Sequence, residues 1–345
     1  MEKKLNWLLV LGLLLSSCSN NEFAVLFEST DKSTAQTVQL ADELKDIPEE
    51  FYDLTIPYLR SYELANGPVE VGQVVAQQAT YTSYLASYQS DGLKINGLLT
   101  IPTIEMPEGG FPGVVFVHGY IPPLEYETVT RYSSHVHALA NQGIVVFKID
   151  LRGHGTSEGE PGGAYFSGDY VIDTLNAYES LKTVDEVNPN KIGLWGHSMA
   201  GNIVLRAMAG KPEVPGVVIW AGAVYTYKDM REFGIADSSY RPSQNANRNR
   251  RQSLSDRFGE PEDGNNFWQL VAPTNYISDL QGKVQVHHAS SDPVVTIEYS
   301  RNLKMLFDES DKPLELYEYD SGGHNIDGEA FSQAIERSVA FYKSM

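Results

Sequence analysis

Three shortages in the 345-residue sequence narrow what the protein can be: it has one cysteine, few basic residues and no long apolar segment. Because Cys18 stands alone, no disulfide can form within the chain. The 26 lysines and arginines face 45 aspartates and glutamates, and a net charge of −19 argues against nucleic-acid binding. The apolar run Leu8–Leu15 is shorter than the roughly 20 residues that span a bilayer. The 42% hydrophobic content is nevertheless enough for a substantial core.

The N-terminus has the features of an export signal. Two lysines precede the apolar run, which ends in Leu15-Ser16-Ser17-Cys18. This segment resembles the bacterial lipoprotein signal, in which the cysteine becomes the lipidated first residue of the mature chain. We therefore expect a signal peptide over residues 1–17, a polar tether over 18–48 and a lipid anchor at Cys18 in the cell envelope; an ordinary secretory signal or an uncleaved anchor is the alternative. The sequence does not indicate which membrane holds the anchor.

The rest of the chain alternates between strand and helix patterns. Residues 49–80 are expected to be an extension packed on a domain of residues 81–345. Two alternating runs, Thr80–Ser90 and Leu93–Ile101, flank Asp91-Gly92, which predicts a hairpin. Further strands are expected at Gly113–Val117, Ile144–Asp150, Lys191–Trp195, Gly216–Trp220, Lys283–His288 and Leu314–Tyr319, and helices at Val129–Asn141, Tyr170–Lys182, Asn202–Ala209, Ile297–Phe307 and Gly328–Lys343. This order predicts an α/β fold, a mostly parallel sheet with helices on both faces.

One long segment interrupts the alternation after the sixth strand. Residues 222–280 hold no convincing strand, so a lid over the site is expected there. The segment carries Tyr240-Arg241-Pro242 and three further arginines, Arg248, Arg250 and Arg251. These cations could attract an anionic substrate, or they could simply be solvated surface charges.

A strand–turn–helix segment contains the candidate nucleophile. The strand Lys191–Trp195 runs into Gly196-His197-Ser198-Met199-Ala200-Gly201 and directly into a helix. Such a turn exposes the hydroxyl of Ser198 at a helix N-terminus, where backbone N–H groups favour negative charge. The pattern departs from Gly-x-Ser-x-Gly by the methyl group of Ala200.

Two later strand ends supply partners for a serine nucleophile, which needs a base and a carboxylate to orient that base. Asp292 follows the strand ending at His288, and His324 lies in a glycine-rich loop after the last strand. Asp292 could instead cap a turn or helix, and His324 could be a packed loop residue. The order Ser198, Asp292, His324 nevertheless favours a nucleophile, acid and base.

An acyl-transfer site also needs donors for the oxyanion. One candidate is the backbone N–H of Met199. The other is the N–H of Tyr120, because Gly119 before it permits close approach; a plain tight turn is the alternative. His118, His154, His197, His287 and His288 are interpreted as structural or secondary residues.

From about Tyr81 to its end, the chain resembles the α/β-hydrolase superfamily, and within it the catalytic domains of the prolyl oligopeptidase (S9) and dienelactone-hydrolase-like group. The resemblance is carried by Ser90–Gly97, His118-Gly119-Tyr120, Asp150–Gly155 and Gly196–Gly201. It implies an esterase or peptidase that uses Ser198, Asp292 and His324 without metal or cofactor. Larger S9 peptidases carry a β-propeller, for which the residues before Tyr81 are too few. We therefore expect an ester substrate, with an S9-like aminopeptidase or a non-catalytic binding protein as alternatives; the oligomeric state stays open.

Overall fold

A computed structural model describes residues 39–236, 247–261 and 264–345. The predicted signal peptide, Cys18, most of the tether and Tyr240–Pro242 lie outside the described residues, as do the side chains of Arg248 and Arg251. The chain divides into residues 1–46, helical over residues 39–44, and residues 47–345, which hold the sheet. Within the described ranges, no helix is both long and apolar enough to cross a membrane.

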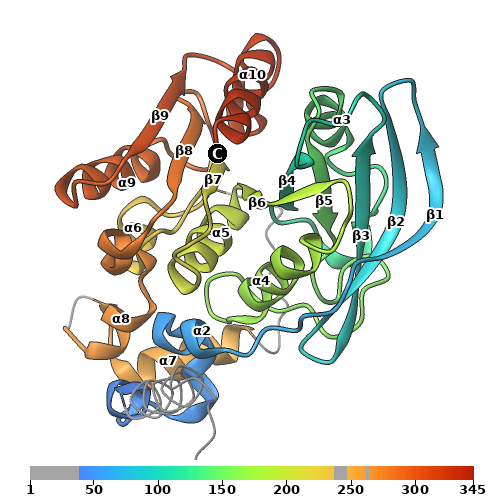
Figure 1. Ribbon diagram of the computed structural model, residues 1–345. Helices are drawn as coiled ribbons and strands as arrows, with labels where there is room; N and C mark the ends of the chain where they lie inside the picture. The colour runs from blue at the N-terminus through green and yellow to red at the C-terminus, as the bar shows by residue number, and fades with distance from the viewer. Residues whose placement is uncertain (1–38, 237–246, 262–263) are drawn as a thin grey trace, which may run out of the picture. The chain divides into compact units, whose positions relative to one another are not determined.

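A single nine-stranded sheet forms the centre of residues 47–345, in the order β1-β2-β3-β5-β4-β6-β7-β8-β9 (Figure 1). The pairs β1–β2, β2–β3 and β3–β5 are antiparallel, and every pair from β5 to β9 is parallel. The α/β prediction is therefore confirmed. The strands are β1 (Glu70–Gln77), β2 (Tyr81–Ser90), β3 (Leu93–Pro102), β4 (Phe111–Val117), β5 (Val145–Ile149), β6 (Val187–His197), β7 (Gly216–Trp220), β8 (Lys283–Ala289) and β9 (Leu314–Tyr319).

The predicted hairpin joins β2 and β3. Ser90 pairs with Leu93, and the two residues between them have positive φ, 55° for Asp91 and 75° for Gly92. Two consecutive positive φ values are typical of a two-residue turn whose twist matches that of the flanking strands. The local sequence Asp-Gly thus determines the register of the whole hairpin.

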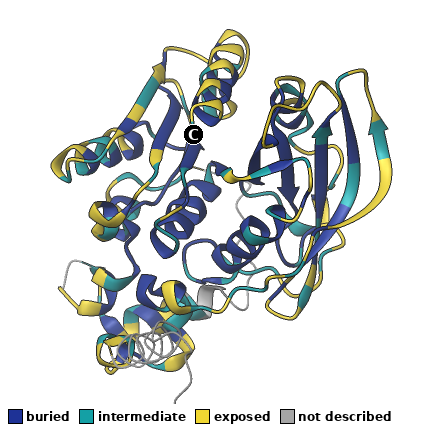
Figure 2. Cartoon of the chain, viewed as in Figure 1, coloured by how far each residue is buried: buried dark blue, intermediate teal, exposed yellow. Residues whose placement is uncertain are grey.

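Helices cover both faces of the sheet, as predicted. On β4, Val115 and Val117 face a core shared with α4 (Asp169–Leu181), α5 (Met199–Gly210) and α9 (Glu298–Glu309). Val114 and Phe116 face a second core shared with α3 (Ser133–Asn141) and α10 (Glu329–Lys343). Burial on both faces explains why β4 is a continuous apolar run, and Figure 2 shows the central strands buried.

The structure adds one strand that the sequence analysis did not predict. Strand β1 lies at the edge of the sheet, and most of its residues are exposed, with Val71 and Val74 about half exposed. Its pairing with β2 is irregular near Val74. Because an exposed edge strand lacks a clean alternation of buried and exposed residues, its sequence carries a weak strand signal. The extension before it contains η1 (Glu49–Leu54) and α2 (Ile56–Ser61).

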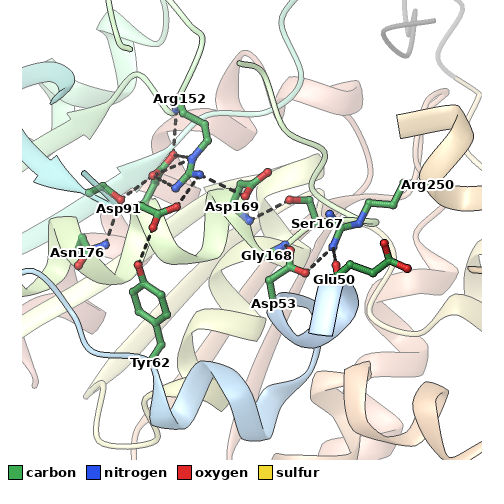
Figure 3. A network of polar contacts seen from close by, with 12 residues as sticks. Glu50, Asp53, Tyr62, Asp91, Arg152, Ser167, Gly168, Asp169, Asn176 and Arg250 are labelled. Atoms are coloured by element: carbon green, nitrogen blue, oxygen red, sulfur yellow. Dashed lines mark hydrogen bonds and ion pairs between the residues drawn. The ribbon is translucent and has the colours of Figure 1, made fainter. Parts of the chain in front are cut away.

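The insertion after β7, the seventh strand once β1 is counted, is helical where it is described. It contains α6 (Tyr227–Phe233), α7 (Asn247–Phe258), α8 (Asn266–Val271) and η4 (Pro273–Asp279), with no strand among its described residues. On α7, the guanidinium of Arg250 donates to the Asp53 carboxylate and to the Glu50 carbonyl (Figure 3). Arg250 is thus engaged by the N-terminal extension, so the structure gives it a structural role and does not support its hypothetical role in attracting a substrate.

Candidate active site

The turn between β6 and α5 holds Ser198 in a strained conformation. Its φ is 54° and its ψ is −119°, which is rare for any residue other than glycine. The backbone N–H of Ser198 donates to the Trp220 carbonyl at 2.9 Å, and the Ser198 carbonyl accepts from the Gly201 N–H at 2.9 Å. These bonds tie the turn to β7 on one side and to the first turn of α5 on the other.

Two glycines allow this turn to be so tight. A Cβ atom on Gly196 would lie 2.6 Å from the Ala200 carbonyl oxygen, and one on Gly201 would lie 2.7 Å from the Gly222 Cα. Ala200 is fully buried, but its position does not require glycine as the positions of Gly196 and Gly201 do. Its methyl group, the departure noted in the sequence, is therefore compatible with the turn, and Gly201 supplies the close approach.

Asp292 and His324 are brought into direct contact. Asp292 lies in the loop after β8, and His324 lies in η5 (Gly323–Asn325), in the loop after β9. The His324 Nδ1 lies 2.8 Å from the Asp292 Oδ2, and the Asp292 side chain is fully buried while that of His324 is 17% exposed. Asp292 also caps the turn that follows it, since its Oδ1 accepts from the Val294 and Val295 N–H groups, so the capping interpretation and the contact with His324 hold together.

Besides the contact with His324, the Asp292 carboxylate contacts His288 and accepts two backbone hydrogen bonds. Its Oδ2 also contacts the His288 Nε2 at 3.3 Å, and its Oδ1 accepts from the backbone N–H groups of Val294 and Val295 at 2.8 and 3.0 Å. Burial raises the pKa of Asp292, but the hydrogen bonds from His288 and His324 outweigh burial and hold the pKa well below its usual range. An ionised Asp292 can only accept, so in a neutral His324 ring the proton lies on Nδ1 and Nε2 keeps its lone pair.

The structure joins His324 to the nucleophile turn through a neighbouring residue. The His197 Nε2 lies 2.8 Å from the His324 carbonyl oxygen, and the two rings are 4.7 Å apart. Among the described residues, no hydrogen bond joins the Ser198 hydroxyl itself to His324. Such bonds often tighten only when substrate binds.

The two candidate oxyanion donors lie after the end of one strand and at the start of one helix. Tyr120 follows β4, and Met199 is the first residue of α5. The Gly119 carbonyl accepts a hydrogen bond from the His118 Nδ1 at 2.7 Å. Because the C=O and N–H of one trans peptide point in opposite directions, this bond turns the Tyr120 N–H away from His118.

Comparison with known proteins agrees with this architecture. Residues 112–249 match the family described as serine aminopeptidase, S33 (Hydrolase_4). The uncharacterized peptidase YtmA of Bacillus subtilis is 25% identical over 245 residues, which cover 70% of this chain and 85% of YtmA. An acetyl xylan esterase from Paenibacillus sp. R4 superposes with a TM-score of 0.60 at 18% identity, over 89% of this chain and 98% of the esterase. Dipeptidyl peptidase 4 of Porphyromonas gingivalis gives a TM-score of 0.58 at 20% identity, over 77% of this chain and 36% of the peptidase.

The chain has the α/β-hydrolase fold. The proteins that it resembles are serine hydrolases, among them both esterases and peptidases. The resemblance to α/β-hydrolases found in the sequence is thereby confirmed.

A polar network supports the loop after β5 in this hydrolase. Arg152 forms a 2.8 Å ion pair with the buried Asp173 and 3.2 Å ion pairs with Asp91 and Asp169 (Figure 3). Asp91 is the first residue of the hairpin turn, and the other two aspartates belong to α4. The Arg-Gly-His-Gly turn is therefore part of the scaffold, as the sequence analysis interpreted it.

Three side chains near the site were missed or undervalued in the sequence. His288 contacts Asp292, His197 contacts the His324 backbone, and Tyr132 contacts His197. His288 is the next-to-last residue of β8, and its Nδ1 lies 2.7 Å from the hydroxyl of Ser300 on α9. A signal existed only for His197, which adjoins the nucleophile along the chain.

Proposed function

We propose that this protein hydrolyses a carboxylic ester through an acyl-enzyme, with Ser198 as nucleophile, His324 as base and Asp292 as the acid that orients it. The observation that carries the proposal is the 2.8 Å contact between the His324 Nδ1 and the buried Asp292 carboxylate. The contact lies at the carboxyl end of the strands, the edge at which the strained Ser198 turn follows β6. Ligands of open α/β sheets bind at this edge.

In this mechanism, the Ser198 Oγ attacks the ester carbonyl carbon while the His324 Nε2 takes its proton. The carbonyl oxygen becomes an oxyanion, stabilised by the N–H groups of Tyr120 and Met199. The oxyanion collapses, and the leaving alcohol takes the proton from His324. Water then attacks the acyl-enzyme with His324 again as base, which releases the carboxylic acid and restores Ser198. Asp292 stays ionised throughout and supports the positive charge on the ring.

The near-complete structural match to an acetyl xylan esterase supports an ester substrate. The chain covers 98% of the acetyl xylan esterase but 36% of the dipeptidyl peptidase. The residues described before Tyr81 include an edge strand of the hydrolase sheet itself. An aminopeptidase activity is the second candidate, because the matching family is described as serine aminopeptidase and YtmA as a peptidase.

The test compares two chromogenic substrates with and without the nucleophile. The full chain in mild detergent is assayed for release of p-nitrophenol from short-chain esters and of p-nitroaniline from aminoacyl anilides, each against Ser198→Ala. Ester turnover that Ser198→Ala abolishes supports the esterase. Comparable anilide turnover favours the peptidase, and no Ser198-dependent turnover of either favours a binding protein on a hydrolase fold.

We also propose that the protein is exported and anchored by a lipid on Cys18. The support is the Leu15-Ser16-Ser17-Cys18 segment behind a short apolar run. Metabolic labelling with a radioactive fatty acid tests the proposal. The label should appear on the wild-type chain and be lost in Cys18→Ala.

A further inference from the structure

A chain of three hydrogen bonds links the loop that carries His324 to the turn that carries Tyr120. The Gly119 N–H donates to the Tyr132 hydroxyl at 3.0 Å, and that hydroxyl lies 2.7 Å from the His197 Nδ1. On its other side, the His197 Nε2 lies 2.8 Å from the His324 carbonyl oxygen.

Only one arrangement of protons satisfies all three bonds. The His324 carbonyl can only accept, so the His197 Nε2 carries a proton. Burial, and then the nearby His324, lower the pKa of His197 to about 3, so its ring is neutral and Nδ1 is a bare acceptor. The Tyr132 hydroxyl must therefore donate to Nδ1, and its oxygen is left to accept from Gly119.

The His324 loop depends on such an anchor. Gly322, Gly323 and Ile326 all have positive φ, 112°, 58° and 55°. Positive φ is unfavourable for a branched residue such as Ile326, so this backbone persists only where its surroundings hold it. Asp292 holds the His324 ring, whereas His197 holds the His324 backbone.

Tyr132, in the same chain of hydrogen bonds, also has a strained backbone conformation. Tyr132 caps α3 with a φ of 57°, which is uncommon for a large side chain. Its ring packs on Phe116 and Trp195, with centroids 5.4 and 6.0 Å away. A Cβ atom on Gly119 would lie 2.8 Å from the Tyr132 hydroxyl, so the turn is built around this contact.

We propose that His197 is a positioning residue that holds the His324 loop against the nucleophile turn and, through Tyr132, against the turn of the Tyr120 oxyanion donor. The catalytic consequence rests on the proposed function, whereas the physical link does not. The hydrogen bonds of the His197 ring go to the Tyr132 hydroxyl and to the His324 carbonyl, not to a reacting atom. It fixes the distance between base, nucleophile and oxyanion donor, because it is the last residue of β6 and directly precedes Ser198.

The test uses four substitutions in the full chain. His197→Asn is too short to reach the His324 carbonyl, His197→Gln places an amide N–H near the position of Nε2, and Tyr132→Phe removes the hydroxyl alone. His287→Asn is the matched control. His287 is equally buried on β8 and bonded to Tyr319 and Gln285, but it has no bond to either turn.

Two readouts are measured on each variant. For ester turnover, His197→Asn should lower kcat about 100-fold with KM nearly unchanged, because a misplacement of about 1 Å costs that much. His197→Gln should recover part of the loss, and Tyr132→Phe should give a smaller one. For hydrogen exchange, peptides covering residues 320–328 should exchange faster in His197→Asn than in the wild type. The control should lose stability but keep its kcat and its exchange in this loop.

Unchanged exchange at residues 320–328 in His197→Asn would overturn the link, whatever the protein's activity. An equal loss of kcat in His287→Asn would show that any buried histidine has this effect and would overturn the positioning role. If His197→Asn does not fold, Tyr132→Phe and His197→Gln decide by the same readouts. Failure of the proposed function is recognised separately, as turnover that survives in Ser198→Ala.

Discussion

Replacing Asp292 with asparagine should reverse the proton position on His324. The Asp292 Oδ1 accepts from two backbone N–H groups, of Val294 and Val295, which can only donate. The asparagine oxygen must therefore keep that place, and its NH2 group then faces His324. The His324 Nδ1 has to become an acceptor, so the proton moves to Nε2, and Nε2 can no longer take a proton from Ser198.

The magnitude follows from this tautomer change. A base in the wrong tautomer lowers kcat about 10⁴-fold, whereas KM should change little because no substrate contact is lost. The free energy of unfolding should also fall, by about 1.5–3 kcal/mol, because a hydrogen bond to a charged group is lost inside the protein. The loss of activity should therefore far exceed any loss of folded protein.

The assay is ester turnover at neutral pH on protein whose folding is verified by urea denaturation. Asp320→Asn is the matched control, since Asp320 is exposed and lies four residues before His324. Its kcat should stay close to that of the wild type. A wrong tautomer should leave far less than a tenth of the wild-type kcat. If Asp292→Asn kept more than about a tenth of it, Asp292 would not be the acid.

Two further predictions concern stability. Gly201→Ala should lower the free energy of unfolding by about 1–3 kcal/mol, measured in urea, because the added Cβ would lie 2.7 Å from the backbone of Gly222. An unchanged midpoint of urea unfolding would refute the close approach of Gly201 to Gly222. Burial, and then Arg337, lower the pKa of His287 from 6.5 to about 3, so between these values the unfolded chain binds more protons than the folded one. The free energy of unfolding should therefore fall as the pH drops from 7 to 5, and about 2 kcal/mol of this fall should be due to His287. The variant His287→Asn should lack that part of the fall. An equal fall in the variant would show that other groups cause it.

The fold was largely predictable because its strands carry strong local signals. The Asp91-Gly92 pair specifies its turn through two residues alone, and the buried parallel strands are unbroken apolar runs, as in Gly113–Val117. Strand β1 was missed for the opposite reason. It lies at an edge, so its side chains are mostly exposed and no burial pattern is imposed on them.

The strand ends at which the candidate residues lie were predictable, but the connections between these residues were not. Ser198, Asp292 and His324 each follow a strand, and parallel strands bring their carboxyl ends to one edge whatever the side chains are. The bond from His197 to the His324 carbonyl spans 127 residues of sequence and ends on a backbone atom, which has no residue type to recognise. The sequence therefore cannot distinguish a histidine that merely precedes the candidate nucleophile from one that also holds the loop of the candidate base. That distinction requires the register of β6 against its neighbours and the strained backbone of residues 322–326, both of which are properties of the folded chain.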